Sequence, residues 1–145
     1  MKILIQRVSH AQVHVDGQLV GAIDQGLLVL LGIGEGDGKA EANKLIAKLL
    51  QLRVFSDEAK KMNRNIQDMN GGILVISQFT LMAETKKGTR PSFSKAAPAD
   101  QARALYDYFV DELKKRHTEI ATGRFGADMD VQLCNQGPVT LMLEA

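Results

Sequence analysis

Residues 27–33 read LLVLLGI, a continuous apolar run that is too short to form a helix of its own. A run of this kind after Gly26 is typical of a β-strand that is buried on both faces. We therefore expect this strand to lie between two layers of structure. Residues 73–79, ILVISQF, follow Gly71-Gly72 and predict a second buried strand of the same type.

Two amphipathic helices are predicted beside these strands. After the glycine-rich loop at residues 34–38, apolar residues recur at helical spacing with charged residues between them. The members of this first apolar stripe are Ala42, Leu45, Ile46, Leu49 and Leu50. A second stripe follows Pro98, a residue suited to the first turn of a helix. Its members are Ala102, Leu105, Phe109, Val110 and Leu113.

Short antiparallel strands are predicted at the N-terminal end. The apolar residues Ile3, Ile5, Val13 and Val15 alternate with polar neighbours, which is the period of a half-buried strand. Asp16-Gly17 is a signal for a tight hairpin turn before the next strand at residues 19–23. The chain is therefore expected to begin with a β-hairpin.

The C-terminal end shows the same alternation. It covers residues 129–133, breaks at residues 135–138 and resumes at residues 139–143, which predicts a strand, a turn and a strand. The order of predicted elements along the chain is strands, helix, strand, helix, strands. This order predicts one α+β domain over residues 1–145, with two helices covering one side of the β structure.

The composition limits the class of function. Of the 145 residues, 45% are apolar and 24% are charged, as in ordinary globular proteins. No apolar run approaches the roughly 18 residues of a membrane helix, and polar residues interrupt the region where a signal peptide would be apolar. We expect a cytoplasmic protein with no membrane contact. A formal net charge of +1 leaves little field to attract long stretches of nucleic acid, so any RNA contact must be local.

Two familiar kinds of site are not supported. Residues 27–39 follow the order of a nucleotide-binding turn, but the glycine spacing fits neither common motif, and Glu35 and Asp37 would repel phosphate. His10 and His14 share one face of a strand, but no third ligand lies near them in sequence. The sequence therefore predicts no metal site and no cofactor.

Ser77, Gln78, Phe79 and Thr80 lie where the second buried strand ends. Small polar side chains and free backbone N–H groups at such a strand end suit an active site. The alternative is that Ser77 and Thr80 only satisfy the last backbone groups of the strand. The residues alone leave both interpretations open.

The long loop at residues 80–97 is basic. It carries Lys86, Lys87, Arg90 and Lys95, with Phe93 between them. Such a segment can contact a phosphate or stack a base, although most loops of this composition are simply solvated.

Gly137-Pro138 stands between two alternating apolar runs. Proline cannot donate a hydrogen bond to a strand ladder, so the dipeptide is unusual there. One explanation for the proline at this position is a turn. A more specific explanation is a rigid dipeptide with a cis bond that points at a ligand.

Four segments taken together resemble the signature segments of the D-aminoacyl-tRNA deacylase family. They are SQFTL at residues 77–81, RPSF at 90–93, GRFGADM at 123–129 and NQGPVT at 135–140. The resemblance covers the whole chain and includes QRV at residues 6–8. Several ordered motifs are far more specific than any one alone.

This resemblance implies a three-layer β/β/α fold, with the two helices packed on a largely antiparallel, barrel-like pair of sheets. It also implies a homodimer with its active site at the interface, acting on the acceptor end of aminoacyl-tRNA. The catalytic residues would be Ser77, Gln78, Phe79 and Thr80.

The substrate-binding residues implied by the resemblance are Gly137, Pro138, Arg7 and Met129. Gly137-Pro138 would come from the partner subunit, held by Arg7, and would exclude L-amino acids. Glycine has no side chain to exclude, so hydrolysis of glycyl-tRNA is expected as well.

An aminoacyl ester is already activated, so hydrolysis needs no Ser-His-Asp triad. The tRNA 2′-hydroxyl would assist the reaction; an alternative reading of the family makes Thr80 the nucleophile.

Two other functions stay open on the residues alone. One is an RNA-binding module without catalysis. The other is a small cysteine hydrolase that uses Cys134, which we interpret instead as a small apolar residue.

Overall fold

The two strands β3 (Gly26–Gly32) and β6 (Gly72–Ser77) form the centre of the fold, side by side and parallel. The computed structural model describes residues 1–86 and 88–145. In it Leu27 and Ile73 face the helices, whereas Leu28 and Leu74 face a second apolar cluster on the other side of the sheet. Burial on both faces is therefore confirmed for both strands. β6 ends at Ser77, two residues earlier than predicted.

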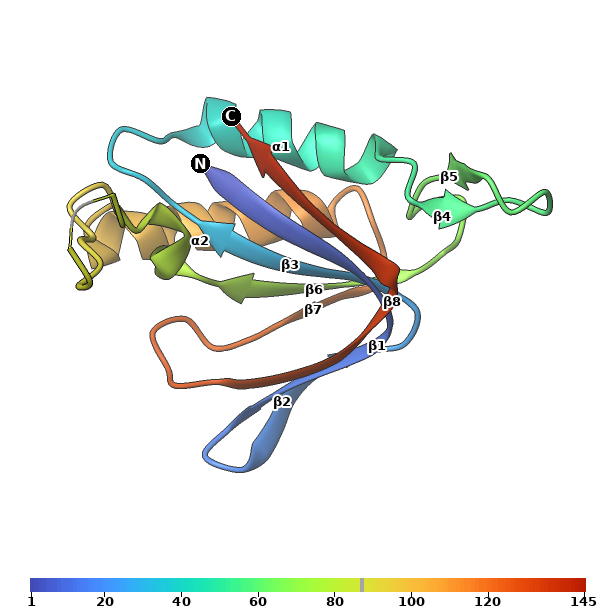
Figure 1. The fold of residues 1–145 in the computed structure, drawn as a ribbon, viewed down its shortest axis with the longest axis horizontal. Helices are drawn as coiled ribbons and strands as arrows, with labels where there is room; N and C mark the ends of the chain where they lie inside the picture. Colours follow the sequence, from blue (N-terminus) through green and yellow to red (C-terminus); the bar gives the residue numbers. More distant parts are fainter. Residues whose placement is uncertain (87) are drawn as a thin grey trace.

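The main sheet is mixed and nearly closed into a barrel (Figure 1). β1 (Lys2–Val15) pairs antiparallel with β2 (Gln18–Ile23), with β3 and with β8 (Asp130–Glu144), whereas β7 (Ile120–Thr122) pairs parallel with β6. β2 and β7 approach closely, because a Cβ at Gly21 would lie 2.5 Å from the Thr122 carbonyl oxygen. The predicted α+β class, with a barrel-like sheet in a single domain, is confirmed.

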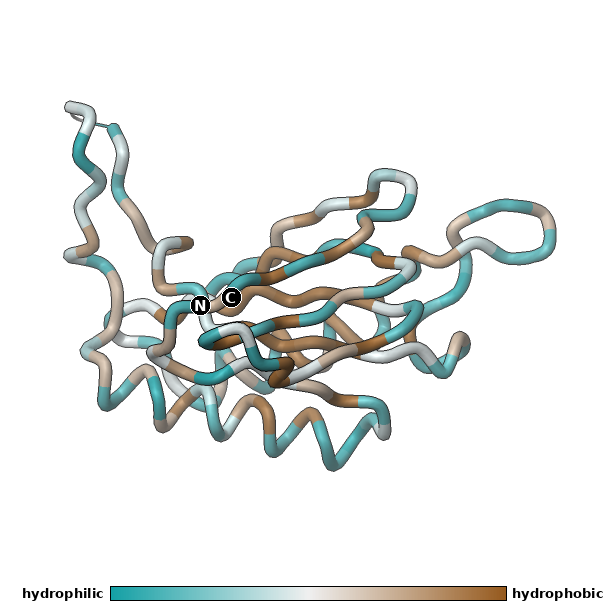
Figure 2. The backbone as a smooth tube through the Cα atoms, turned by 90° about the horizontal axis from the view of Figure 1, so that it is seen from below, coloured by the Kyte–Doolittle hydropathy of each residue, from teal (hydrophilic) through white to brown (hydrophobic). Residues whose placement is uncertain are grey.

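The helices α1 (Lys39–Gln51) and α2 (Ala99–Lys114) pack together on one face of this sheet. All ten residues of the two predicted apolar stripes are buried. Pro98 lies just before α2 and not inside its first turn, where its carbonyl accepts the N–H of Ala102 at 2.9 Å. Figure 2 shows the basic loop before α2 projecting away from the body of the molecule.

Three short elements were not predicted from the sequence. They are the hairpin of β4 (Phe55–Ser56) and β5 (Met62–Arg64), the strand β7, and a 3₁₀ helix, η1 (Phe79–Met82). Strands of two or three residues are too short to show a period in sequence.

The prediction of a turn between two C-terminal strands was wrong. β8 runs without reversal from Asp130 to Glu144, with a bulge in which residues 136–139 lie opposite Arg7 of β1. The Asn135 side chain closes this bulge, since its Oδ1 accepts the Val139 N–H at 3.1 Å and its Nδ2 donates to Thr140 Oγ1 at 2.8 Å. The chain therefore stays paired with β1 on both sides of the dipeptide.

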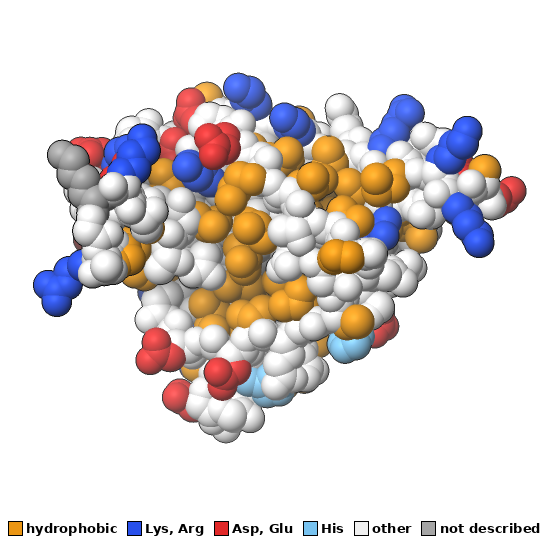
Figure 3. Space-filling view, in the orientation of Figure 1, with side chains coloured by type: hydrophobic (Ala, Val, Ile, Leu, Met, Phe, Trp, Pro, Cys, Tyr) orange, Lys and Arg blue, Asp and Glu red, His pale blue; other side chains and the backbone are white. Residues whose placement is uncertain are grey.

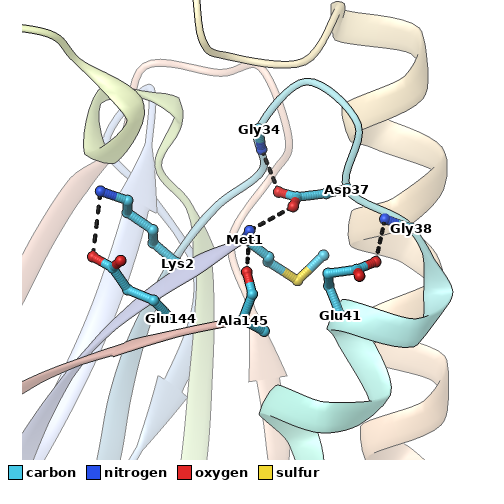
Figure 4. Close-up of polar contacts among 8 residues, drawn as sticks. All are labelled: Met1, Lys2, Gly34, Asp37, Gly38, Glu41, Glu144 and Ala145. Atoms are coloured by element: carbon cyan, nitrogen blue, oxygen red, sulfur yellow. Dashed lines mark hydrogen bonds and ion pairs between the residues drawn. The ribbon is translucent and has the colours of Figure 1, made fainter.

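The two chain ends are fixed beside the loop that leads into α1 (Figure 4). The Met1 ammonium lies 2.6 Å from Asp37 Oδ1 and donates to the Ala145 carbonyl at 3.1 Å. Asp37 Oδ2 accepts the Gly34 N–H at 2.6 Å. One carboxylate thus joins β1 to the start of α1. None of the helices in the described part of the chain is long and apolar enough to cross a membrane.

Candidate active site

The carboxyl end of β6 opens into the 3₁₀ helix η1. The Gln78 N–H donates to the Leu31 carbonyl at 2.8 Å, which is the last bond between this segment and β3. The Leu81 N–H then turns back to the Gln78 carbonyl at 3.2 Å. The N–H groups of Phe79 and Thr80, at the start of η1, have no acceptor within the helix. Two backbone donors are therefore available at this point.

The side chains of Gln78 and Thr80 interact. Gln78 Nε2 donates a hydrogen bond to Thr80 Oγ1. A hydroxyl that accepts one bond in this way keeps its own proton to donate elsewhere. Thr80 is exposed and Ser77 half-buried, and no hydrogen bond among the described residues joins either hydroxyl to a histidine or carboxylate. The geometry favours Thr80 as a donor over Thr80 as an activated nucleophile.

A pocket of about 490 Å³ lies beside this segment. Its volume is in the range of small-molecule sites. Its walls come from the ends of β3 and β6, the start of α2 and the segment before and within β8. The lining residues are Leu31, Ile33, Ile76, Ser77, Gln78, Phe79, Ala96, Ala97, Ala99, Ala102, Phe125, Gly126, Ala127, Asp128, Met129 and Val131. The face drawn in Figure 3 is apolar at its centre, with charged side chains toward its edges.

Tyr106 ties α2 to the strand below the pocket. Its hydroxyl donates to the Val75 carbonyl at 2.9 Å, two residues before Ser77. Burial raises the pKa of Tyr106 well above its ordinary value, so the phenol stays protonated and remains a donor. Its ring contacts the Phe125 ring at a centroid distance of 5.6 Å, and Arg103 covers Phe125 at 4.9 Å. The wall containing Phe125 is thus fixed to α2.

Met129 is held at the opposite wall by a close approach to Gly123. A Cβ at Gly123 would lie 2.6 Å from the Met129 sulfur and 3.0 Å from Ile76 Cδ1. A side chain at position 123 would therefore push the flexible Met129 side chain away from this place.

The structure brings four of the eight predicted site residues to this pocket, namely Ser77, Gln78, Phe79 and Met129. Thr80 is the next residue along η1. The other three predicted residues, Arg7, Gly137 and Pro138, lie elsewhere. Arg7 is opposite Leu27 and Leu27 is opposite Ile73, four residues before Ser77. With three strand spacings added, the dipeptide lies about 20 Å from Ser77 along the sheet.

The Gly137-Pro138 bond is cis, as anticipated. Arg7 Nε donates to the Gln136 carbonyl at 2.9 Å, and Arg7 Nη1 donates to the Val54 carbonyl at 2.6 Å. A Cβ at position 137 would lie 2.8 Å from Arg7 Nη2, and the φ of +134° also favours glycine there. Gly137 and Pro138 are both exposed on the outside of the chain.

The remaining sequence candidates lie outside the pocket. Cys134, interpreted from the sequence as a small apolar residue, is exposed, because Val131 and Leu133 take the inward positions of β8. His10 faces Cys134 in the strand register, but its Nδ1 contacts Ser9 Oγ at 3.1 Å. The described residues contain no cluster of three side chains that could hold a metal ion. Lys87 of the basic loop lies outside the described residues.

Sequence reasoning missed the wall formed by Ala96, Ala97, Ala99 and Ala102. The signal was present, since small residues crowd the start of α2, where a longer side chain would fill the space. Phe125 stands within the segment GRFGADM, but its place in the pocket was not predicted. Its place in the wall depends on packing against Tyr106, which sequence spacing does not reveal.

Comparisons with known proteins match this chain over its whole length. The family described as D-Tyr-tRNA(Tyr) deacylase matches residues 4–144. A D-aminoacyl-tRNA deacylase of Cellvibrio japonicus (strain Ueda107) is 62% identical over 97% of both chains. One of Stutzerimonas stutzeri (strain A1501) is 58% identical over 100% of both chains.

Two solved structures are also similar. The chain of a structure titled c-Myc DNA Unwinding Element Binding Protein is 42% identical, with a TM-score of 0.96 over 100% of this chain and 99% of that one. A probable eukaryotic D-amino acid tRNA deacylase is 15% identical, with a TM-score of 0.86 over 99% and 98%, and supports the fold alone. On the family match and the identity to its relatives, the chain belongs to the D-Tyr-tRNA(Tyr) deacylase family of hydrolases.

Proposed function

We propose that this protein hydrolyses the ester that joins a D-amino acid to the 3′ end of tRNA, releasing both. The observation that carries the proposal is the pocket at the end of β6, with Ser77, Gln78 and Phe79 in its lining. Relatives that are 55–62% identical over nearly the whole chain bear the name D-aminoacyl-tRNA deacylase. Membership of the family and the open pocket together favour this reaction.

In the proposed reaction, water attacks the ester carbonyl carbon and the bond to the ribose oxygen breaks. The hydroxyl of water stays on the amino acid, and its proton passes to the ribose oxygen. The backbone N–H groups of Phe79 and Thr80 stabilise the oxyanion that forms on the carbonyl oxygen. The neighbouring ribose 2′-hydroxyl assists by orienting the water, and the Thr80 hydroxyl, oriented by Gln78, polarises the substrate.

We further propose that a second copy of the chain completes the site. Gly137-Pro138 is exposed and does not line the pocket beside Ser77 of its own chain. Arg7 holds the dipeptide through Gln136, which presents a rigid backbone wall. Among the described residues β8 pairs with β1 alone, and Leu141 and Met142, on opposite faces of this edge strand, are exposed apolar residues that a second copy could cover.

Such a wall enforces chirality by collision, because an L side chain and a D side chain leave the α-carbon in different directions. A glycyl ester has no side chain to collide, so glycyl-tRNA is a substrate in this proposal.

We also propose that the enzyme works in the cytoplasm, where aminoacyl-tRNA is used. Cell fractionation that finds the protein in another compartment would contradict this location.

The first prediction concerns stereoselectivity. D-tyrosyl-tRNA should be hydrolysed and L-tyrosyl-tRNA spared, because only the L side chain meets the backbone wall. The measurement is release of labelled tyrosine from the two substrates at equal enzyme concentration. Equal rates for both would contradict the proposal. Binding of tRNA with no release from either substrate would favour an RNA-binding module without catalysis.

The second prediction concerns the nucleophile. Thr80→Val removes the hydroxyl while keeping the shape of the side chain, and turnover should fall by roughly tenfold to a hundredfold, because the backbone donors remain. Loss of a covalent nucleophile would cost far more, on the order of a millionfold. Cys134→Ala is the control and should keep full activity, because Cys134 is outside the pocket.

Two outcomes would contradict that prediction. Mass spectrometry that traps an acyl group on Thr80 would make Thr80 the nucleophile. Loss of turnover in a folded Cys134→Ala protein would revive a cysteine hydrolase.

The third prediction concerns the second copy. Light scattering should give the mass of a dimer, and Pro138→Gly in a folded dimer should raise hydrolysis of L-tyrosyl-tRNA more than it slows the D substrate, because the wall is loosened. Asn70→Gly, at an exposed turn residue whose φ of +47° suits glycine and which lies outside the pocket, is a matched surface control. A monomeric active enzyme, or a Pro138→Gly dimer with unchanged selectivity, would contradict the proposal.

A further inference from the structure

Two aromatic rings lie exposed at the edge of the pocket. Phe79, which lines the pocket, is 57% exposed, and Phe93 of the basic loop is 39% exposed. Their ring centroids are 5.0 Å apart with an interplanar angle of 63°, so the two rings meet edge to face. Exposed phenylalanine is costly in water, and a paired arrangement at a pocket mouth calls for a ligand with an apolar face.

Backbone bonds hold Phe93 in this position. Glu84 and Ser92 exchange two N–H to carbonyl bonds, of 2.8 and 3.0 Å, which close the loop just before Phe93. The Ala96 N–H donates to the Phe93 carbonyl at 3.0 Å, just after it. The ring is therefore presented from a fixed backbone, although the loop projects from the body of the molecule (Figure 2). A surface that is already ordered loses less entropy on binding.

The charge around the rings is positive. Lys95 pairs with Glu84 at 3.1 Å, and its hydrogen bond holds the pKa of that carboxyl below its usual value. Lys86 and Arg90 are exposed, and the ion pairs among the described residues use neither of them. Aromatic faces among free basic side chains are the combination that binds single-stranded nucleic acid, where rings stack bases and cations meet phosphates.

We propose that Phe93, braced by Phe79, stacks the base of the nucleotide that precedes the terminal, aminoacylated nucleotide of tRNA, while Arg90 and Lys86 contact its phosphates. This inference rests on the proposed function, because it takes the terminal nucleotide to lie in the pocket. The tRNA chain that leaves the pocket past the Phe79 ring then reaches the Phe93 ring, which is the adjacent exposed aromatic side chain. The formal net charge of the whole chain is only +1, which is consistent with contacts limited to these few nucleotides.

The test compares a substrate that has the nucleotides before the terminal one with a substrate that lacks them. D-tyrosyl-tRNA carries the preceding nucleotides, whereas the D-tyrosyl ester of adenosine has none. Phe93→Leu, which keeps apolar bulk but removes the ring, should raise KM for D-tyrosyl-tRNA by about tenfold with kcat little changed. Its kcat/KM for the adenosine ester should equal that of the unsubstituted protein.

Two further variants sharpen the result. Phe93→Tyr keeps a stacking ring and should retain the KM of the unsubstituted protein for D-tyrosyl-tRNA. Arg90→Gln should make the KM for D-tyrosyl-tRNA less dependent on salt, because one phosphate contact is lost, and should leave the adenosine ester unaffected.

Several outcomes would overturn the inference. One is an equal loss on both substrates in Phe93→Leu, which would mean that Phe93 only supports the pocket. An unchanged KM for D-tyrosyl-tRNA would do the same, as would conversion of the Phe93→Leu protein to another oligomeric state, which would assign the rings to contact between copies. Failure of the proposed function is distinct, because the unsubstituted protein would then hydrolyse neither substrate.

Discussion

The parallel strands β3 and β6 are buried on both faces, and this burial determines how the other elements of the fold are arranged. Leu27 and Ile73 need the helices on one side, and Leu28 and Leu74 need the barrel cluster on the other. Parallel strands end at the same edge of a sheet. The helices on one face and the apolar cluster on the other therefore both end near Leu31 and Ser77. The pocket lies at this shared edge, where polar backbone groups emerge from an apolar layer.

The covering layers also decide what the pocket can do. Small residues at the start of α2 leave its wall open, whereas Tyr106 fixes that helix to the Val75 carbonyl just before Ser77. The donors at the pocket are mostly backbone groups and hydroxyls held by the turn from β6 into η1. A site of this kind can stabilise developing negative charge without a strong base, which suits an ester that is already activated.

Much of the fold was predictable because it follows local rules. The continuous apolar run at residues 27–33 forms a strand buried on both faces, and the apolar stripes of both helices, which recur at helical spacing, are buried. The parallel order of β3, β6 and β7 was not predictable, because partner choice depends on contacts distant in sequence. The bulge at residues 136–139 resembles a turn in sequence, but pairing with β1 continues on both sides of it.

The candidate site was predictable in part. The strand end at Ser77 identified the floor of the pocket because small polar residues there follow a buried run. The walls at Ala102 and Phe125 could not be found this way, since they come from segments that only the fold brings together. The edge-to-face contact of Phe79 with Phe93 likewise depends on the path of the loop between them.

A crystal structure with a non-hydrolysable D-aminoacyl amide of adenosine would show whether the aminoacyl end of tRNA binds in the pocket at the end of β6. We expect the nucleoside to lie between Met129 and the start of α2, with the amide carbonyl oxygen facing the N–H groups of Phe79 and Thr80. Binding of this analogue at any other place on the molecule, with the pocket left empty, would contradict it.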